Sequence, residues 1–136
     1  MNLLVRLRER LNLTYLFISH DLAMVRHISD RVLALYLGKV AEAGPWREVS
    51  DEPRHPYARS LRDAGLVPDP SRRTTAPVLR GEVPSADRPP AGCRFHPRCP
   101  VAEDRCRTTE PALLEPRPGH QAACHVAADE ATVSSA

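Results

Sequence analysis

The hydrophobic positions of the first 44 residues follow the periods of regular secondary structure. Residues 1–11 are predicted to form an amphipathic helix, because leucines recur at helical spacing between arginines, at Leu3, Leu4, Leu7 and Leu11. Thr14–Ile18 is β-branched and aromatic and is too short for a free helix, which predicts a buried strand. Leu22, Val25 and Ile28 recur every third position, so a second helix is expected after this strand.

Two further strands are predicted over Val32–Leu37 and Val40–Ala43. Gly38–Lys39 lies between them and suits a two-residue type II′ hairpin turn, in which glycine comes first. The first of these strands has apolar residues on both faces, so it is expected to be central or covered on both sides. Pro45 and Pro56 then suit the first positions of two short helices.

The composition changes after these elements. All 14 prolines lie at or after Pro45, and residues 65–91 lack apolar periodicity, as expected of a connector. With 136 residues, the chain is one ordinary domain or a small domain with a long tail. The helix-then-strand order predicts an α/β fold, and because no strand precedes the first helix, we expect that partner strands have been cut away.

The charge and hydropathy of the chain narrow its functional class. The 19 basic and 17 acidic residues give a net charge of +2 and are dispersed, which argues against a nucleic-acid partner. There is no apolar run of membrane-spanning length, and the amino terminus alternates arginine with leucine instead of forming a signal-peptide core. A cytoplasmic chain is therefore expected.

His20 is the first candidate for chemistry. It follows the predicted strand Thr14–Ile18 and precedes the predicted second helix. Ligands of α/β sheets bind outside the carboxyl ends of strands, and the start of a helix favours anions such as phosphate. The alternative is that His20 caps the helix or fills a loop. His55 and Tyr57, beside Pro56, are interpreted as packing residues.

Four cysteines fall within 32 residues, at Cys93, Cys99, Cys106 and Cys124. This segment is too polar to form a core, so a cross-link or a metal has to stabilise it if it is ordered. Zinc sites normally contain a closer cysteine pair, disulfides are disfavoured in the cytoplasm, and an iron–sulfur cluster tolerates wider spacing. From the spacing alone, three interpretations remain: an iron–sulfur cluster, a zinc site and four unrelated thiols. His96, His120 and His125 are interpreted as spectators.

Taken together, these motifs resemble one family. The chain is similar to the carboxyl-terminal part of ATP-binding subunits of ABC transporters, of the oligopeptide, dipeptide and nickel permease type. The resemblance rests on the run from Leu16 to Ala23, the segment Tyr36–Val40, the triplet His55-Pro56-Tyr57 and the four cysteines. The resemblance covers residues 1 to about 125. It implies that residues 1–50 are a fragment of the P-loop ATPase domain, that residues 51–125 are a cysteine-rich extension, and that residues 126–136 are a disordered tail.

The resemblance also implies roles for individual residues. The family residue that matches His20 is the switch histidine (H-loop), which contacts the γ-phosphate of ATP bound with Mg²⁺. Family members with cysteines that match Cys93, Cys99, Cys106 and Cys124 hold a 4Fe-4S cluster, which we prefer to zinc on this ground. The expected partners are permease transmembrane subunits, a second ATP-binding subunit and, indirectly, a substrate-binding protein, at the cytoplasmic face of the plasma membrane.

The sequence departs from the family where ATP is bound. There is no G-x-x-x-x-G-K-[ST] loop, and the Q-loop, the signature sequence and the acidic strand end are missing as well. We therefore interpret the chain as a fragment of the ATP-binding subunit of an importer of oligopeptides or dipeptides, inactive as an ATPase by itself. The alternative is a free-standing, cysteine-rich metal-binding interaction module without nucleotide chemistry.

Overall fold

The computed structural model describes residues 2–19, 22–65, 79 and 81–133. Its elements are, in chain order, α1 (Asn2–Leu11), α2 (Leu22–Ile28), β1 (Arg31–Tyr36), β2 (Lys39–Pro45), α3 (Trp46–Asp51), α4 (Pro56–Gly65), a 3₁₀ turn η1 (His96–Arg98), α5 (Arg105–Thr108), β3 (Leu114–Arg117), β4 (His120–Ala122) and α6 (His125–Val133). The helices predicted for residues 1–11, after residue 21, after Pro45 and at Pro56 are confirmed.

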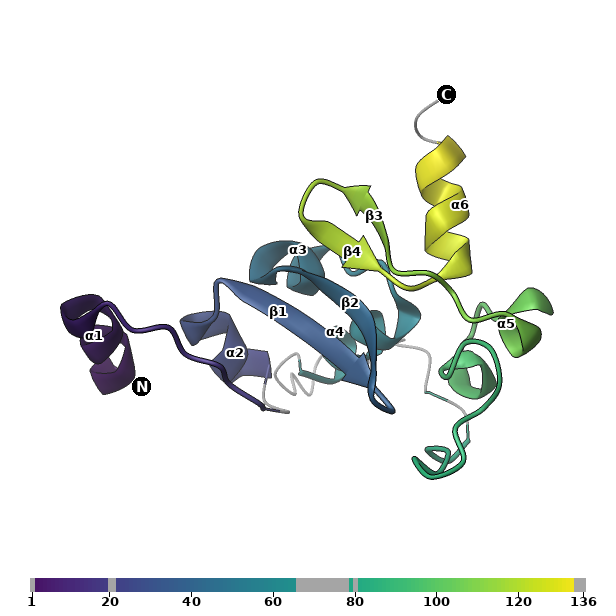
Figure 1. The fold of residues 1–136 in the computed structure, drawn as a ribbon, viewed down its shortest axis with the longest axis horizontal. Helices are drawn as coiled ribbons and strands as arrows, with labels where there is room; N and C mark the ends of the chain where they lie inside the picture. Colours follow the sequence, from purple (N-terminus) through teal and green to yellow (C-terminus); the bar gives the residue numbers. More distant parts are fainter. Residues whose placement is uncertain (1, 20–21, 66–78, 80, 134–136) are drawn as a thin grey trace, which may run out of the picture.

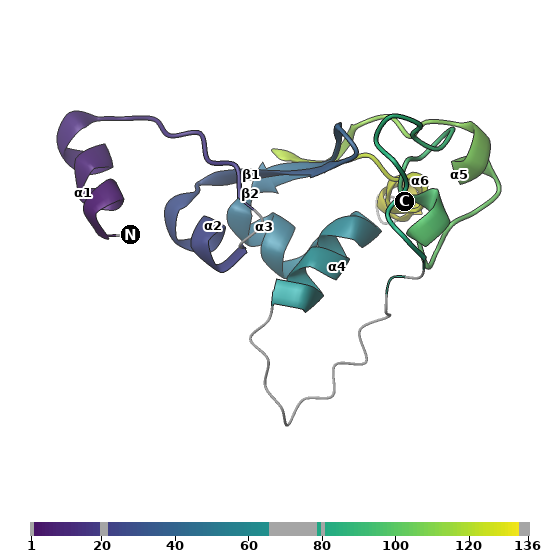
Figure 2. The same cartoon turned by 90° about the horizontal axis from the view of Figure 1, so that it is seen from below.

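The strands form one antiparallel sheet in the order β1-β2-β4-β3. Helices α2, α3 and α4 lie on one face of it (Figures 1 and 2). β4 pairs directly with β2, so a hairpin from near the carboxyl end extends the sheet begun by residues 31–45. We call β1–β4 with α3 and α4 the sheet body. The mixture of helices and sheet agrees with the expected α/β class.

The turn between β1 and β2 differs from the prediction by one residue. Leu37 and Gly38 form the turn, with φ angles of 46° and 79°, and Tyr36 pairs with Lys39. Two positive φ angles are typical of a type I′ turn, whereas the predicted type II′ turn needs only one. The error arose because Leu37, a residue that rarely adopts positive φ, was assigned to the strand.

The predicted strand Thr14–Ile18 is wrong. Residues 13–19 form neither helix nor strand, and Leu16 and Ile18 are 90% and 97% exposed. A strand needs a neighbour for its backbone hydrogen bonds, and within the described residues no strand pairs with this segment. A β-type sequence alone is therefore not sufficient to form a strand.

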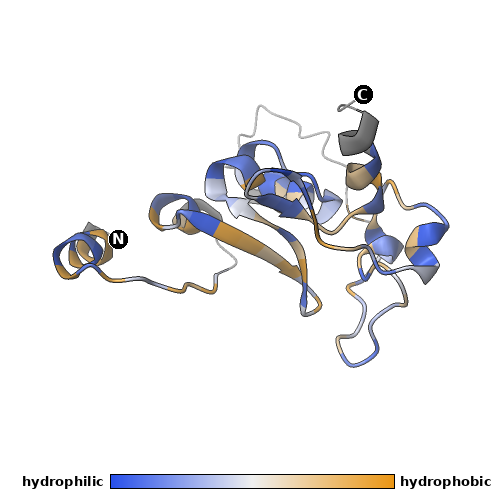
Figure 3. Ribbon diagram, turned by 45° about the horizontal axis from the view of Figure 1, so that its top comes forward, coloured by the Kyte–Doolittle hydropathy of each residue, from blue (hydrophilic) through white to orange (hydrophobic). Residues whose placement is uncertain are grey.

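The prediction that the first hairpin strand is central or covered on both sides is also wrong. β1 is an edge strand, and its Leu33 and Leu35 are 60% and 57% exposed. Tyr36, in contrast, is buried on the helix-covered side. Figure 3 shows the same apolar character along β1 and along the extended segment that follows α1.

Helix α1 lies at one end of the molecule, beside α2 and away from the sheet body (Figure 1). Its Arg8 donates a hydrogen bond of 3.0 Å to the carbonyl of Ile28 and pairs with Asp30 at 3.3 Å. Leu3 and Leu11 remain 68% and 62% exposed. The predicted amphipathic helix therefore forms, but much of its apolar face is uncovered.

At the other end, the disordered tail predicted for residues 126–136 is helical over its described part, because α6 runs from His125 to Val133. Residues 81–91, in the predicted connector, contain no helix or strand. Among the described helices, none has the length and apolarity needed to cross a lipid bilayer.

Candidate metal centre and its buried support

The four cysteines are carried by loops at the end of the sheet body where the β1–β2 turn lies. Cys93 precedes the 3₁₀ turn η1, Cys99 follows it, Cys106 lies in α5, and Cys124 lies between β4 and α6. All four are free thiols, Cys106 is buried, and the other three are half-buried. The structure therefore brings together side chains that are up to 31 positions apart in sequence, from 93 to 124.

Backbone contacts hold two of these loops together. The amide of Cys93 donates a hydrogen bond of 2.9 Å to the carbonyl of Cys106. Gly92, with φ of 65°, makes this approach possible, because an added Cβ would lie 2.5 Å from the same carbonyl oxygen. Cys93 and Cys106 are thereby fixed side by side.

The thiols influence one another's ionisation. Burial raises the pKa of Cys99 to about 11 and also raises the pKa of Cys93 and Cys124. The other cysteines add to the rise at Cys99, because nearby thiolates repel one another. A positively charged centre among the thiols would reverse this repulsion and favour the thiolate form.

The donor set suits a centre that is held by thiolates, since four unpaired thiols lie within electrostatic reach of one another. Across the part of the chain that the structure describes, no three His, Cys, Asp or Glu side chains converge tightly enough to hold a metal ion. The arrangement is thus a loose set of thiols and not a preformed site for one ion.

Three aromatic rings pack around Phe95, which lies two residues after Cys93. Phe95 is 1% exposed, and its ring centroid lies 5.1 Å from Tyr36, 5.6 Å from Tyr57 and 5.6 Å from His55. These rings come from β1, from α4 and from the residue before α4. Phe95, the only aromatic residue among the cysteines, therefore fastens the cysteine loops to the sheet body.

His55 and Tyr57 are packing residues, as the sequence indicated. His55 is 3% exposed, and its Nδ1 accepts a hydrogen bond of 3.0 Å from the amide of Tyr57. Burial, helped by the nearby Arg59 guanidinium, lowers the pKa of His55 to about 4. His55 is therefore neutral at pH 7 and accepts a hydrogen bond in the first turn of α4.

A buried Glu–His pair lies behind the cysteines. Glu42 on β2 and His120 on β4 are both fully buried, and His120 Nε2–H donates to Glu42 Oε1 over 2.6 Å. The same carboxylate accepts hydrogen bonds from the amides of Arg54 at 2.9 Å and His55 at 2.7 Å. Gly44 leaves room for the imidazole, since an added Cβ would lie 3.2 Å from Cδ2 of His120.

This pair was missed in the sequence, where His120 was interpreted as a spectator. The available signal was a glutamate between Ala41 and Ala43 in a predicted strand, because a carboxylate on an apolar strand needs a buried partner. His96 and His125 each donate a hydrogen bond of 3.0 Å to a backbone carbonyl, of Cys93 and Thr109 respectively. His20, the predicted nucleotide contact, lies outside the described residues.

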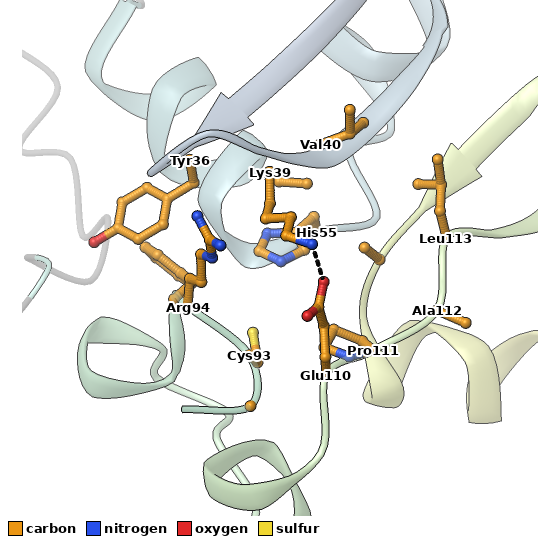
Figure 4. A pocket seen from close by; sticks show the side chains of 14 residues that line it. Tyr36, Lys39, Val40, His55, Cys93, Arg94, Glu110, Pro111, Ala112 and Leu113 are labelled. Atoms are coloured by element: carbon orange, nitrogen blue, oxygen red, sulfur yellow. Dashed lines mark ion pairs between the residues drawn. The ribbon is translucent and has the colours of Figure 1, made fainter. Parts of the chain in front are cut away.

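A cavity of about 490 Å³ opens beside Cys93. Figure 4 shows Cys93 between Arg94 and Glu110, with Lys39 reaching from the hairpin turn to Glu110. The Lys39 Nζ to Glu110 Oε1 distance is 2.8 Å, and this contact lowers the pKa of Glu110. The ion pair therefore crosses the cavity between the sheet body and the loop after α5.

Comparison with known proteins finds relatives that are named for peptide transport. The profile of one family, described as the oligopeptide/dipeptide transporter C-terminal region, matches residues 41–106. A putative peptide import ATP-binding protein of Brucella ovis is 52% identical over 124 residues, which cover 91% of this chain and 39% of the relative.

Two further relatives give the same result. The oligopeptide transport ATP-binding protein AppF of Bacillus subtilis is 48% identical over 93% of this chain and 39% of its own length. The oligopeptide transport ATP-binding protein OppF of Escherichia coli is 48% identical over 83% of this chain and 34% of its own length. The chain thus spans about two fifths or less of the length of these relatives.

Proposed function

Because residues 41–106 match the profile of the oligopeptide/dipeptide transporter C-terminal region, we propose that the chain is the carboxyl-terminal part of the ATP-binding subunit of an ABC importer of peptides. The observation that carries this proposal is the identity of 48–52% with peptide-import ATP-binding proteins over most of the chain. ATP and Mg²⁺ are then ligands of the whole subunit, whose ATP hydrolysis drives peptide uptake.

We assign His20 the role of the switch histidine. An imidazole N–H can donate to a phosphoryl oxygen that gains negative charge during transfer, in a reaction catalysed mainly by positioning and electrostatics. The start of α2, directly after residues 20 and 21, is a setting that favours anions. His20 supplies only one contact, so the other phosphate and Mg²⁺ ligands have to come from the rest of the subunit.

We assign Cys93, Cys99, Cys106 and Cys124 as the ligands of a 4Fe-4S cluster. Four thiolates complete the ligand set of such a cluster, which spans a wider volume than one ion. The free thiols and their mutual electrostatic influence support this assignment. When bound, the cluster would supply a cross-link between loops that are poor in apolar contacts, and we assign it no electron transfer.

The proposed partners follow from the proposed function. The subunit would dock on permease transmembrane subunits at the cytoplasmic face of the membrane and pair with a second ATP-binding subunit. A substrate-binding protein would act through the permease. Peptides are the proposed cargo because the relatives are named for peptide and oligopeptide transport.

The ATPase part of the proposal is tested in a chimera. Residues 1–136 replace the matching segment of the Brucella ovis relative, and Mg²⁺-dependent ATP hydrolysis is measured. We expect an active chimera that loses about a hundredfold in rate on His20→Ala, since one phosphate-facing donor is removed. His27→Ala changes an exposed residue of α2, so it is the matched control and should retain activity. Full activity of the His20→Ala chimera contradicts the assignment.

The cluster is tested on the chain itself. After anaerobic purification, iron, sulfide and zinc are measured per chain, together with the visible absorbance spectrum. We expect about four iron and four sulfide per chain, lost when Cys99 or Cys124 is replaced by serine. One zinc and no iron would contradict the cluster assignment and favour a zinc site instead.

A further inference from the structure

Glu42 is the point at which three distant parts of the chain meet. Its carboxylate accepts hydrogen bonds from the amides of Arg54 and His55 and from the ring of His120, which lie 12, 13 and 78 positions away. Glu42 and His120 are fully buried. Because a buried carboxylate is costly to leave without partners, these contacts are strongly specified.

One arm of this network leads to Cys124. His120 begins β4, and Ala122 of the same strand pairs with Glu42 in the sheet register. The next residue, Ala123, donates a hydrogen bond of 2.9 Å to the carbonyl of Ala41. Cys124 follows directly, so the hydrogen bond to Glu42 fixes the strand from which this thiol extends.

The other arm leads to Cys93 and Cys106. The amide of His55 donates a hydrogen bond to Glu42, and the ring of His55 packs on Phe95 with the centroids 5.6 Å apart. Phe95 lies two residues after Cys93, whose amide is bonded to the carbonyl of Cys106. The same carboxylate therefore also helps to set the position of the Cys93 and Cys106 thiols.

We infer that Glu42 and His120 are positioning residues for the cysteine site, which hold Cys124 at a fixed separation from Cys93 and Cys106. This inference rests on the proposed role of the cysteines as ligands of one centre. Ligands are precise only when a supporting layer of hydrogen bonds fixes the segments that carry them. Glu42 and His120 supply such a layer in the interior, whereas the other printed contacts between the Cys124 and Cys106 segments, Arg105 with Asp129 and His125 with the carbonyl of Thr109, lie at the surface.

A surface contact provides a matched control. Arg117 on β3 pairs with Glu52, just after α3, at 2.6 Å, and both side chains are at least half exposed. This ion pair also joins the β3–β4 hairpin to the segment after α3, but it lies in solvent, where such pairs contribute little. Glu52→Gln therefore removes a charge from the same junction without touching the buried network.

The test uses two measurements on the full chain. The first is the iron retained per chain after anaerobic purification. The second needs no metal: in the reduced chain carrying Cys99→Ser and Cys106→Ser, a short bis-alkylating reagent bridges Cys93 and Cys124, and the rate of bridging reports their separation.

His120→Leu removes the donor, and we expect about a tenfold loss both of retained iron and of bridging rate. His120→Gln places an amide donor near the position of Nε2 and should keep both within about twofold of wild type, as should Glu52→Gln. If His120→Leu does not fold, His120→Asn, whose shorter amide does not reach Glu42, takes its place.

The outcomes separate this inference from the proposed function. Wild-type bridging rates in both His120→Leu and His120→Asn would overturn the positioning role, whatever metal the wild type holds. A loss in His120→Gln as large as that in His120→Leu would also overturn it, since the donor would then be irrelevant. If the wild type holds no iron but the His120 variants still bridge more slowly, the positioning role is supported and the cluster assignment is contradicted.

Discussion

The segment of residues 13–19 and the aromatic cluster around Phe95 contain similar apolar and aromatic residues but differ in burial. Phe17 is 37% exposed and Ile18 is 97% exposed, whereas Phe95 is 1% exposed. Phe95 has three rings around it, from β1, from α4 and from the residue before α4, while the ring contact described for Phe17 is with Tyr15, two residues away. The difference shows that an apolar side chain is buried only when distant segments supply its partners.

The largest expected effect separates the two phenylalanines of the chain. Phe95→Ala should lower the free energy of unfolding by about 3–5 kcal/mol, because it empties the centre of the aromatic cluster. Phe17→Ala should cost less than about 1 kcal/mol, because its ring is partly in solvent already. Urea unfolding of both variants measures the difference, and equal losses would show that residues 13–19 are as well packed as the aromatic cluster around Phe95.

A smaller effect distinguishes two glycines with positive φ. Gly92→Ala should destabilise the chain by about 3 kcal/mol or more, because its Cβ would meet the carbonyl oxygen of Cys106 at 2.5 Å. Gly81→Ala has the same sign of φ but no atom of the described residues within 4 Å of the added Cβ, so it should cost about 1 kcal/mol. Thermal unfolding measures both, and similar losses would contradict the close packing of the cysteine loops.

The smallest effect is a pH dependence that arises at His55, whose ring belongs to the aromatic cluster around Phe95. The folded state holds the pKa of His55 at about 4, below its ordinary value of 6.5. The unfolded chain therefore binds this proton more readily than the folded chain. The contribution of neutral His55 to the free energy of unfolding is fully present above pH 6.5 and is lost as the pH falls toward 4. About 2 kcal/mol should disappear between pH 8 and pH 5.

His55→Asn is the control for this pH dependence. Its amide oxygen can accept the hydrogen bond from Tyr57 but does not titrate. Denaturant unfolding at several pH values should show a flatter profile for the variant than for the wild type. Identical slopes would mean that His55 takes up its proton without unfolding, contrary to its burial.

The local elements were predictable where one stretch of sequence contains its own signal. The helix at Asn2–Leu11 follows leucine spacing, and α4 begins at Pro56 because proline suits a first helical position. The hairpin of β1 and β2 was also predicted, although its turn begins at Leu37 instead of Gly38. In these cases neighbours within a few positions decide the backbone conformation.

The support of the cysteine site was not predictable in this way. Glu42 and His120 are 78 positions apart, and neither spacing nor periodicity connects them. The strand expected at residues 14–18 failed for the converse reason, since its local pattern was correct but no described strand pairs with it. Pairing between segments that are distant in sequence depends on which segments meet in the fold, and neither segment's own sequence determines this.

The sequence by itself determined the cysteine set, the family resemblance and the helices whose apolar spacing is local. Only the tertiary structure decided that β4 pairs with β2, that Phe95 closes an aromatic cluster and that Glu42 joins the two halves of the cysteine site. The physical reason is that spacing along a chain fixes hydrogen bonds over three or four residues. The partners of a buried carboxylate or ring are instead fixed by which surfaces exclude water together.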